Sequence, residues 1–456
     1  RPLRGERIVV VCGSGNNGGD GFGAARLLAS SPRVGDVAVL LVGSKAPVGG
    51  DAAAMLARLG EAGLSAVEVA DEAGLAPLRT ATLVVDALFG TGLSRPLEEG
   101  SHLARVVSLC STRRAFVVAV DVPSGLDAGS ARGDVPHVRA DLTVTFGYPK
   151  PAHVFAPAAG SCGRVVVADI GLLPDEGSGG PEAVTARDVA PLLPRRPCAA
   201  HKGTYGTLGV VGGAAGMAGA AALAARSAFR SGVGKVVVVA DEASRPAVHA
   251  LVAEATTAGA LPKAGLSAVA VGPGLGTSNA ARALLDAALG TGLPAVLDAD
   301  ALNLLAGSPG SLRGRGAPTV LTPHPGEASR LLGVPIPDVV ADPEGVARRL
   351  ADGSGAVVVL KGFRSVVAEP GGRTARVLSG NPGMASGGSG DVLTGIVGAL
   401  LARGFCARDA ASAGAYLHGL AGDLAAERLG EEPLAASDLA ASLPDANLVV
   451  AEAGPA

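Results

Sequence analysis

Short apolar runs rich in β-branched residues alternate with Ala- and Leu-rich stretches along most of this chain, and the alternation limits the folds that it can adopt. In the first part the apolar runs are IVVVC (8–12), VAVLLVG (37–43), TLVVDALFG (82–90), FVVAVDVP (116–123) and LTVTFGYP (142–149). Strands of a parallel sheet are buried on both faces, so they are continuously apolar and are joined by helices. The pattern therefore predicts an α/β fold with a mostly parallel sheet covered by helices on both faces.

The alternation stops between residues 173 and 202 and then resumes, which indicates two domains. Five prolines and a GSGG run fall in this stretch, a composition typical of linkers. A chain of 456 residues is long enough for two domains. We expect a first domain over 1–173, a linker over 174–200 that overlaps the start of the next domain, and a second domain over 183–456.

Composition disfavours several classes of protein. The net charge is −3 and the basic residues are scattered, so no basic stripe indicates nucleic acid binding. Three Tyr, eight Phe and no Trp leave few side chains on which bases could stack. The five cysteines lack any CxxC pair, which favours reduced thiols over disulfides or a zinc site. With no signal peptide and no apolar run of membrane length, we expect a cytoplasmic protein that acts on small molecules, without nucleic acid or membrane partners.

The stretch GNPGMASGGSGDVLTG (380–395) predicts a glycine-rich turn at the start of a buried helix. Gly387, Gly388 and Gly390 allow successive backbone N–H groups to converge on an anion, and the helix dipole favours negative charge at the same place. Asp391 would repel a phosphate there, but it would be well placed as a base that takes a proton from a hydroxyl group. The alternative, an acidic residue that only stabilises the first helical turn, stays open at this point.

A second glycine-rich segment, GSGNNGGDGFGAARLL (13–28), follows the first apolar run and opens a helix. Gly13, Gly15 and Gly18 satisfy the dinucleotide pattern G-x-G-x-x-G. The match is weak, because no acidic residue ends the second strand and because Asn16, Asn17 and Asp20 add polar side chains to the expected loop. A turn rich in Asn and Gly for conformational reasons alone is the alternative.

Two more strand ends carry polar residues. Asp86 lies near the end of LVVDALFGTGLSRP (83–96), where Gly90, Thr91 and Gly92 predict an anion-binding turn, and Asp121 and Ser124 lie in VAVDVPSGLD (118–127). In a parallel sheet such ends converge, so Asn17, Asp86, Asp121 and Ser124 are expected to lie near each other. Oxygen ligands without His or Cys suit an alkali or alkaline-earth cation.

With these motifs the first part, about residues 7–173, resembles the NAD(P)H-hydrate epimerase family, whose defining motifs are NNGGDG, VDALFGTG and DVPSGLD. The resemblance implies a Rossmann-like three-layer domain, a potassium ion among Asn17, Asp86 and Ser124, and Asp86 as candidate acid/base. It implies that the hydrated dinucleotide is held by Asn16, Asn17, Gly18, Gly19, Asp20, Gly90, Thr91, Gly92, Leu93, Ser94, Arg95, Pro96 and Asp121. The family has a helical segment before the first strand, whereas here a strand is expected by Ile8, so we expect that segment to be missing.

The second part carries HKGTYG (201–206), GMAGA (216–220), GPGLG (272–276), DADALNLL (298–305), TPHPGE (322–327) and LKGFRSVV (360–367). None matches the P-loop pattern. His324 stands on a stiff loop between two prolines, and Lys361 at a strand end could neutralise a phosphate. A structural histidine and a solvated lysine are the alternatives.

Together with GGSGD, these motifs resemble the ribokinase-like ADP-dependent NAD(P)H-hydrate dehydratases, from about Ala183 onward. The resemblance implies that Ala220, Gly274, His324 and Asp391 contact the hydrate, and that the adenine nucleotide is cradled by Lys361, Gly362, Phe363, Arg364, Ser365 and Gly390. Asp391 would help the C6 hydroxyl of the hydrate attack the β-phosphoryl group of ADP, giving NAD(P)H, AMP and phosphate. Magnesium is expected with the nucleotide. The dehydratase acts only on the S form of the hydrate. An epimerase on the same chain would convert the remaining R form to the S form.

Two alternatives remain at this point. A ribokinase-like vitamin kinase would share the fold and GGSGD, but would not explain TPHPGE or the fused first domain. In the other, the first domain is a non-catalytic scaffold or RNA-binding module, which Asp86 and NNGGDG disfavour. The sequence leaves a homo-oligomer open, and it does not decide between NADH and NADPH hydrates or between ADP and ATP.

Overall fold

The computed structural model describes residues 6–43, 48–93, 95–111, 114–172 and 182–453. The chain divides into two compact units, Arg1–Ser178 and Gly179–Ala456, and each is described by itself. Part of the expected linker belongs to the second unit, since a strand and a short helix occupy 182–189. Among the described residues, no helix has the length and apolarity needed to cross a bilayer.

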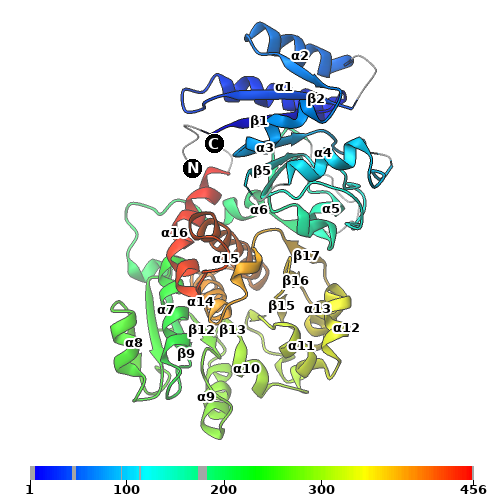
Figure 1. Cartoon of the computed structure of the whole chain (residues 1–456). Helices are drawn as coiled ribbons and strands as arrows, with labels where there is room; N and C mark the ends of the chain where they lie inside the picture. The colour runs from blue at the N-terminus through cyan, green and yellow to red at the C-terminus, as the bar shows by residue number, and fades with distance from the viewer. Residues whose placement is uncertain (1–5, 44–47, 94, 112–113, 173–181, 454–456) are drawn as a thin grey trace. The chain divides into compact units, whose positions relative to one another are not determined.

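The first unit is built on a seven-stranded sheet in the order β3-β2-β1-β4-β5-β6-β7 (Figure 1). All six strand pairings are parallel. The strands are β1 Ile8–Cys12, β2 Val37–Val42, β3 Ala66–Val69, β4 Leu83–Ala87, β5 Phe116–Val120, β6 Leu142–Phe146 and β7 Arg164–Ala168. The predicted parallel sheet is confirmed, and β3 and β7 extend it at both edges.

Helices cover both faces of this sheet. They are α1 Asn16–Ala29, α2 Gly50–Glu61, α3 Ala76–Thr80, α4 His102–Cys110 and α5 Pro151–Val154. Alternate residues of β1 enter different cores: Val10 packs with Phe22 of α1 on one face, and Val11 packs with Val106 of α4 on the other. This is the three-layer arrangement expected from the apolar runs. One local expectation was wrong, because the NNGGDG segment is not a loop but the first turns of α1, which begins at Asn16.

The second unit has a ten-stranded sheet in the order β11-β10-β9-β12-β13-β14-β15-β16-β17-β8. Neighbouring strands are parallel from β11 to β15, after which β16 and β17 form antiparallel pairs and β8 is parallel to β17. The strands are β8 Glu182–Val184, β9 Thr207–Val211, β10 Lys235–Val239, β11 Thr256–Ala258, β12 Ala268–Val271, β13 Ala295–Leu297, β14 Thr319–Leu321, β15 Val357–Leu360, β16 Val366–Ala368 and β17 Thr374–Val377. The carboxyl ends of β13, β14 and β15 therefore lie side by side.

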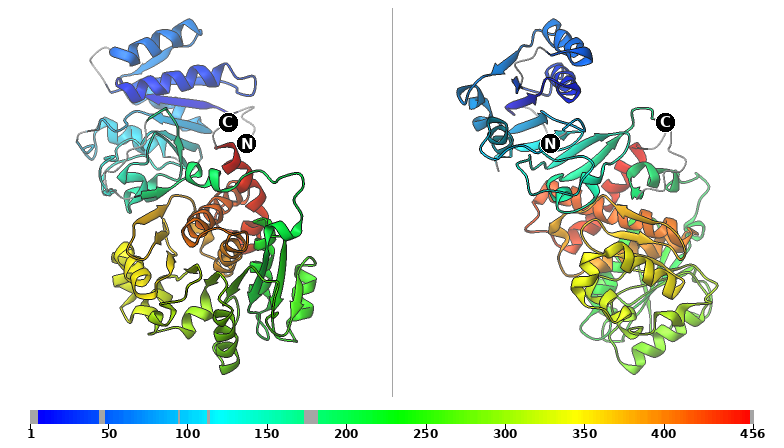
Figure 2. Two further views of the ribbon diagram at one scale, coloured as in Figure 1. Left: turned by 180° about the vertical axis from the view of Figure 1, so that it is seen from behind. Right: turned by 90° about the vertical axis from the view of Figure 1, so that its right-hand side faces the viewer.

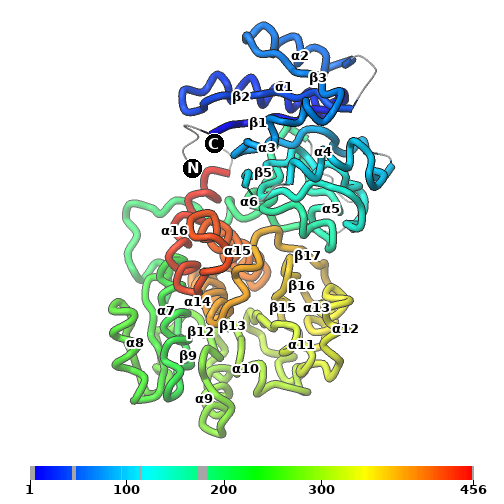
Figure 3. Tube along the Cα trace, in the orientation of Figure 1, coloured from blue at the N-terminus to red at the C-terminus, as the bar shows by residue number. Residues whose placement is uncertain are grey.

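Helices enclose this sheet as well, with α14, α15 and α16 packed on one face and α9, α11 and α13 on the other (Figure 2). The helices of the unit are α6 Ala186–Val189, α7 Ala218–Arg230, α8 Arg245–Leu251, α9 Asn279–Gly290, α10 Ala299–Leu304, α11 Pro325–Leu332, α12 Ile336–Ala341, α13 Pro343–Ser354, α14 Ser389–Ala402, α15 Ala407–Leu429 and α16 Ala436–Glu452. Figure 3 traces the chain through α14, α15 and α16. Each face of the sheet has its own hydrophobic core. Val296 of β13 belongs to one core and the next residue, Leu297, to the other, so both faces of this strand are buried.

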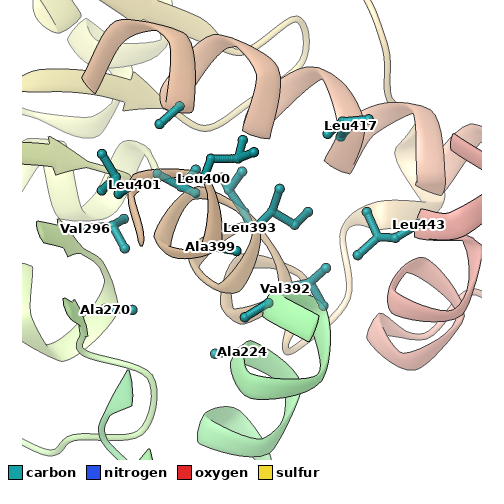
Figure 4. Packing of buried hydrophobic residues seen from close by; sticks show 14 of the residues in the cluster. Ala224, Ala270, Val296, Val392, Leu393, Ala399, Leu400, Leu401, Leu417 and Leu443 are labelled. Carbon is teal, nitrogen blue, oxygen red and sulfur yellow. The ribbon is translucent and has the colours of Figure 1, made fainter. Parts of the chain in front are cut away.

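Helix α14 is apolar on every side and runs through the core of the second unit. Figure 4 shows Val392, Leu393 and Leu400 among side chains from α7, the sheet, α15 and α16. A helix with no polar face is stable only when it is surrounded by protein. Each of its fully buried large side chains contributes about 1.5–3 kcal/mol of hydrophobic stabilisation. The packing fixes the first turn of the helix, and with it Asp391.

Candidate active sites

A cavity of about 650 Å³ lies in the second unit at the carboxyl ends of β13, β14 and β15. Ligands of open parallel sheets bind at this edge. Its lining includes the predicted residues His324, Lys361, Gly362, Phe363, Arg364, Ser365, Gly390 and Asp391. The expectation that these segments meet at one place therefore agrees with the structure.

The glycine-rich turn leads directly into α14 along this lining. Gly388 has φ of +91°, a left-handed conformation that favours glycine, whereas Gly387 and Gly390 do not need positive φ. Asp391 lies in the first turn of the helix and is partly buried. Burial raises the pKa of Asp391, the charge of Asp298 raises it further, and Lys361 opposes both, so that the pKa is about 7. A carboxylate with such a pKa can serve as a general base near neutral pH.

Lys361 is held by two carboxylates. Its Nζ lies 2.6 Å from Asp298 Oδ1 and 3.7 Å from Glu327 Oε2. Burial lowers the pKa of the Lys361 ammonium group, but the charges of Asp298 and Glu327 more than offset this, and the net pKa lies above its usual value. Lys361 is thus a fixed positive charge beside Asp391, not a solvated surface lysine.

His324 caps the start of α11 at the same cavity. Its Nδ1 accepts a hydrogen bond from the backbone of Gly326, and its own backbone N–H donates to Glu327. Burial lowers the pKa of the His324 ring, against the opposing charge of Glu327, so the ring is neutral at pH 7. The side chain remains half exposed. A neutral ring held at the rim is well placed to contact a ligand.

The segment from Lys361 to Ser365 is the turn between β15 and β16. Arg364 adopts a positive φ of 53° and is almost fully buried, whereas Phe363 is exposed, with the Arg364 guanidinium 5.2 Å from its ring centroid. The backbone of Gly362 donates to the Ser365 hydroxyl at 3.3 Å. A buried cation and a fixed turn beside Lys361 suit an anionic ligand with an aromatic part.

Ala220 and Gly274, both predicted to contact the hydrate, are close together but are not in the lining given above. A Cβ atom on Gly274 would lie 3.2 Å from Cβ of Ala220 and 2.8 Å from Met217. Gly388 connects this pair to the cavity, since a Cβ there would lie 2.7 Å from Leu223 of α7. Ala220 of α7 and Gly274, which follows β12, therefore lie together beside the glycine-rich turn.

The motif HKGTYG lies elsewhere. A Cβ atom on Gly206 would lie 2.0 Å from the carbonyl oxygen of Ala402, the last residue of α14. Because Asp391 is in the first turn of the same helix, this motif is about 15 Å or more from the base. His201, Lys202 and Tyr205 are not among the residues that line the cavity.

In the first unit Ser124 binds both carboxylate oxygens of Asp86. The Ser124 hydroxyl donates to Asp86 Oδ1 at 2.6 Å, and the Ser124 backbone N–H donates to Oδ2 at 2.8 Å. Leu88 N–H donates to Oδ1 as well. Burial raises the pKa of Asp86 to about 6, although these hydrogen bonds oppose the shift. Asp86 has no exposed surface.

Asn17 and Asp121 meet at Gly90. A Cβ atom on Gly90 would lie 3.1 Å from Asn17 Oδ1 and 3.1 Å from Asp121 Oδ2. Lys150 donates to Asp121 Oδ1 at 2.6 Å, and Thr145 donates to the same oxygen at 3.0 Å. Asp121 also has a positive φ of 67°, an unusual conformation that is common at functional sites. The predicted convergence of strand ends is thus seen in the structure.

The other predicted residues of the first unit differ in how exposed they are. Gly18 and Gly19 are buried in α1, whereas Asn16 and Asp20 are exposed. Burial raises the pKa of Asp20, and the charge of Asp121 adds to it. Thr91 N–H faces Asp121 Oδ2 at 3.4 Å, while Gly92, Arg95 and Pro96 are exposed, Leu93 is partly buried, and Ser94 lies outside the described residues.

Sequence reasoning assigned no role to several residues of these sites. Asp298 and Glu327 stand within the motifs DADALN and TPHPGE, and Lys150 follows the strand β6. His418 of α15 lines the cavity and contacts the Ser389 carbonyl oxygen at 2.9 Å. Position after a strand could have pointed to Asp298 and Lys150, but nothing local to α15 marks His418.

Comparisons with known proteins agree with this geometry. Residues 208–445 match a family model described as NAD(P)H-hydrate dehydratase, and residues 2–152 match one described as YjeF-related protein N-terminus. The bifunctional NAD(P)H-hydrate repair enzyme Nnr of Thermofilum pendens is 41% identical over 96% of this chain and 87% of its own length. The chain belongs to this family. The bifunctional NAD(P)H-hydrate repair enzymes thus share both units with it.

Two solved structures resemble the second unit. The ADP/ATP-dependent NAD(P)H-hydrate dehydratase from Bacillus subtilis, co-crystallised with ATP and Mg²⁺, is 34% identical, with a TM-score of 0.55 over 59% of this chain and 98% of its own. A ribokinase-like superfamily protein from Enterococcus faecalis is 24% identical, with a TM-score of 0.53 over 62% of this chain and 100% of its own. The second match supports only the fold. The ribokinase-like fold of the second unit is confirmed.

Proposed function

We propose that this chain repairs hydrated nicotinamide nucleotides by two activities. The first unit interconverts the R and S forms of NAD(P)H hydrate, and the second dehydrates the S form to NAD(P)H while ADP becomes AMP and phosphate. The observation that carries this proposal is that Asp391, with a pKa of about 7, and Lys361 line one cavity of the unit that matches the dehydratase family. The expected site of action is the cytoplasm.

Asp391 is the proposed general base of the dehydration. It accepts the proton of the C6 hydroxyl while that oxygen attacks the β-phosphorus of ADP, and AMP leaves. The C6–O bond of the phosphate ester then breaks and phosphate leaves with the electron pair, pushed by the lone pair of the ring nitrogen, and loss of a C5 proton to water forms the double bond of NAD(P)H. His324, Ala220 and Gly274 are the proposed contacts of the hydrate.

The nucleotide is proposed to bind along the turn from Lys361 to Ser365 and at Gly390. Lys361 supplies a positive charge, and the start of α14 supplies N–H groups toward phosphate oxygens. Magnesium would neutralise phosphate charge and is proposed to arrive bound to the nucleotide. We assign it no protein ligand, because Asp298 and Glu327 are already engaged by Lys361.

A potassium ion is proposed in the first unit among Asn17, Asp86 and Ser124, and these residues fit it. The Ser124 hydroxyl oxygen lies 2.6 Å from an Asp86 oxygen and 3.1 Å from the Phe89 carbonyl oxygen, so hard oxygen atoms cluster there. Asn17 lies beside the Gly90 turn that follows Phe89, and its buried Nδ2 has no hydrogen-bond partner in the described structure, so reversing the amide would cost no hydrogen bond of that nitrogen. The ion would hold the Gly90 turn against the dinucleotide.

The acid/base of epimerisation is proposed to be Asp86 or Asp121. The pKa of about 6 suits Asp86 for proton transfer, but its burial restricts it to transfer through Ser124. Asp121 is paired with Lys150 and lies beside the predicted dinucleotide loop, so it can meet a ligand directly. Epimerisation needs one group to accept a proton and one to donate it, and the Asp121–Lys150 pair can do both.

The test is to incubate the protein with a mixture of both hydrate epimers, with and without ADP, and to follow NADH absorbance. Conversion of the whole mixture, only when ADP is present, is the expected result. Conversion that stalls after one epimer, beyond slow spontaneous exchange, would disprove the epimerase activity. Phosphorylation of a vitamin alcohol in place of hydrate-dependent ADP consumption would favour a ribokinase-like kinase.

A further inference from the structure

Asp298 is a buried carboxylate in the lining of the second unit's cavity. It directly follows β13, and its side chain is 2% exposed. Its Oδ1 accepts from Lys361 Nζ at 2.6 Å, and its Oδ2 accepts from the Thr394 hydroxyl at 2.8 Å. Both oxygens therefore have partners from other elements. A buried carboxylate bound in this way cannot move without disturbing those partners.

These two hydrogen bonds connect the ends of β13 and β15 to the beginning of α14. Thr394 is one turn beyond Gly390, and its hydroxyl oxygen also lies 3.0 Å from the Gly390 carbonyl oxygen. A Cβ atom on Gly390 would lie 3.2 Å from Lys361 Nζ and 3.3 Å from Asp298 Oδ2. The missing side chain at Gly390 is what allows the ion pair to lie against the helix.

The ion pair also sets the charge around Asp391. The charged neighbours that act on it are Asp298 and Asp300 at β13 and α10, Glu327 of α11 and Lys361 at β15. Among these charges Asp298 has the largest effect on the pKa of Asp391, although burial is the largest cause overall. His324, which caps α11, and His418 of α15 line the same cavity, and burial lowers the pKa of both rings, to about 4 for His418. Both rings are therefore neutral at pH 7 and add no charge.

We propose that Asp298 is a positioning residue of the dehydration reaction: it fixes the Lys361 ammonium group against the glycine-rich turn at the start of α14. This inference rests on the proposed function. Lys361 alone, at the same place, would weaken Asp391 as a base, because a positive charge stabilises a carboxylate. Asp298 offsets that effect while keeping Lys361 available to the phosphate groups.

The charge effect is tested by Asp298→Asn, which keeps the shape of the side chain and an oxygen that can accept from Lys361. The Asp391 carboxyl group is titrated by ¹³C NMR in protein labelled at aspartate carboxyl carbons, without ligand, and its signal is assigned by its loss in Asp391→Asn. We expect the midpoint to fall from about 7. The expected fall in Asp298→Asn is roughly 1 pH unit. The midpoint of the pH–rate profile should fall in parallel. An unchanged midpoint would overturn the inference.

Asp300→Asn is the matched control, because this carboxylate is next but one in the chain and accepts from Gly276 and Asn303. It should lower the midpoint less than Asp298→Asn does. An equal shift of the Asp391 midpoint in the two variants would mean that Asp298 affects Asp391 no more than any nearby carboxylate does. Because the NMR titration needs no hydrate, its outcome is separate from that of the proposed function, which fails if the wild-type protein shows no hydrate-dependent ADP consumption.

The positioning effect is tested at Thr394 without any change of charge. Thr394→Val removes the hydrogen bond to Asp298, and Thr394→Ser restores a hydroxyl group. We expect the valine variant to raise KM for ADP roughly tenfold, as for the loss of a hydrogen bond to a charged group, and to leave the Asp391 midpoint in place. The serine variant should recover most of the loss. Equal KM values for valine and wild type, with both variants folded by thermal unfolding, would overturn this part of the inference.

Discussion

Asp86 and Asp391 are acids near the carboxyl edge of a parallel sheet, but Asp86 is buried, Asp391 is partly buried, and their neighbours differ. Asp86 has no exposed surface and accepts from a hydroxyl and two backbone N–H groups, all neutral. Asp391 lies at a cavity of about 650 Å³ among three other carboxylates and one ammonium group. Burial raises the pKa of both, to about 6 and about 7. A raised pKa alone therefore does not identify a base; access to a ligand must accompany it.

The largest expected effect is at Asp391. Replacement by Asn removes the base and should lower the rate of ADP-dependent dehydration of the S epimer by about 10³-fold. Epimerisation, measured by chromatographic separation of the two epimers without ADP, should keep its wild-type rate. A variant that still dehydrates at more than a tenth of the wild-type rate would show that Asp391 is only a charge in the first turn of α14.

The next effect separates Asp86 from Asp121 in the first unit. Asp121→Asn should lower epimerisation by about 10²-fold if Asp121 exchanges protons with the ligand, with KM little changed. Asp86→Asn should also impair epimerisation, but through the potassium site. Added potassium at high concentration is then expected to recover part of the activity. If only Asp86→Asn impairs epimerisation and potassium has no influence, Asp86 is the acid/base.

The pH dependence of dehydration should follow Asp391. Since the group acts as a base in its ionised form and its pKa is about 7, the rate should rise with pH through that value and level off above it. Between pH 6 and pH 8 the expected increase is roughly tenfold. Steady-state rates with saturating ADP and hydrate give the profile. A rate that is flat over this range, or that falls, would mean that another group carries the proton.

The smallest expected effect is that of potassium. Replacement of potassium salts by choline chloride at constant ionic strength should slow epimerisation severalfold, because Asn17, Asp86 and Ser124 lose the ion that holds the Gly90 turn. Dehydration of the pure S epimer serves as the internal control and should not change. An equal loss of both activities would place the ion effect outside the first unit.

Much of the fold followed from the sequence because the buried strands are continuous apolar runs. The strands that were not anticipated are short, with three to five residues each, and all except β16 include a polar residue; they are β3, β7, β8, β11, β16 and β17. The helical start at Asn16 was missed because Asn and Gly favour turns. Here packing of Gly18 and Gly19 inside the unit, not local preference, decides the conformation.

Some site residues could be predicted from the sequence and others could not. Asp391, His324 and Lys361 stand in motifs and could be named from sequence. The contacts of Asp298 with Lys361 and Thr394 span 63 and 96 residues, and no local pattern reveals such pairs. Lys150 reaches Asp121 across 29 residues in the first unit and was missed for the same reason.

The most direct test of two sites on one chain is complementation between single variants. Asp391→Asn and Asp121→Asn are each incubated with pure R hydrate and ADP, and then together, while NADH absorbance is followed. Neither variant alone should form NADH faster than spontaneous epimerisation allows, and the mixture should restore conversion toward the wild-type rate. Rapid conversion by either variant alone, or no recovery in the mixture, would contradict the assignment of epimerisation to the first unit and dehydration to the second.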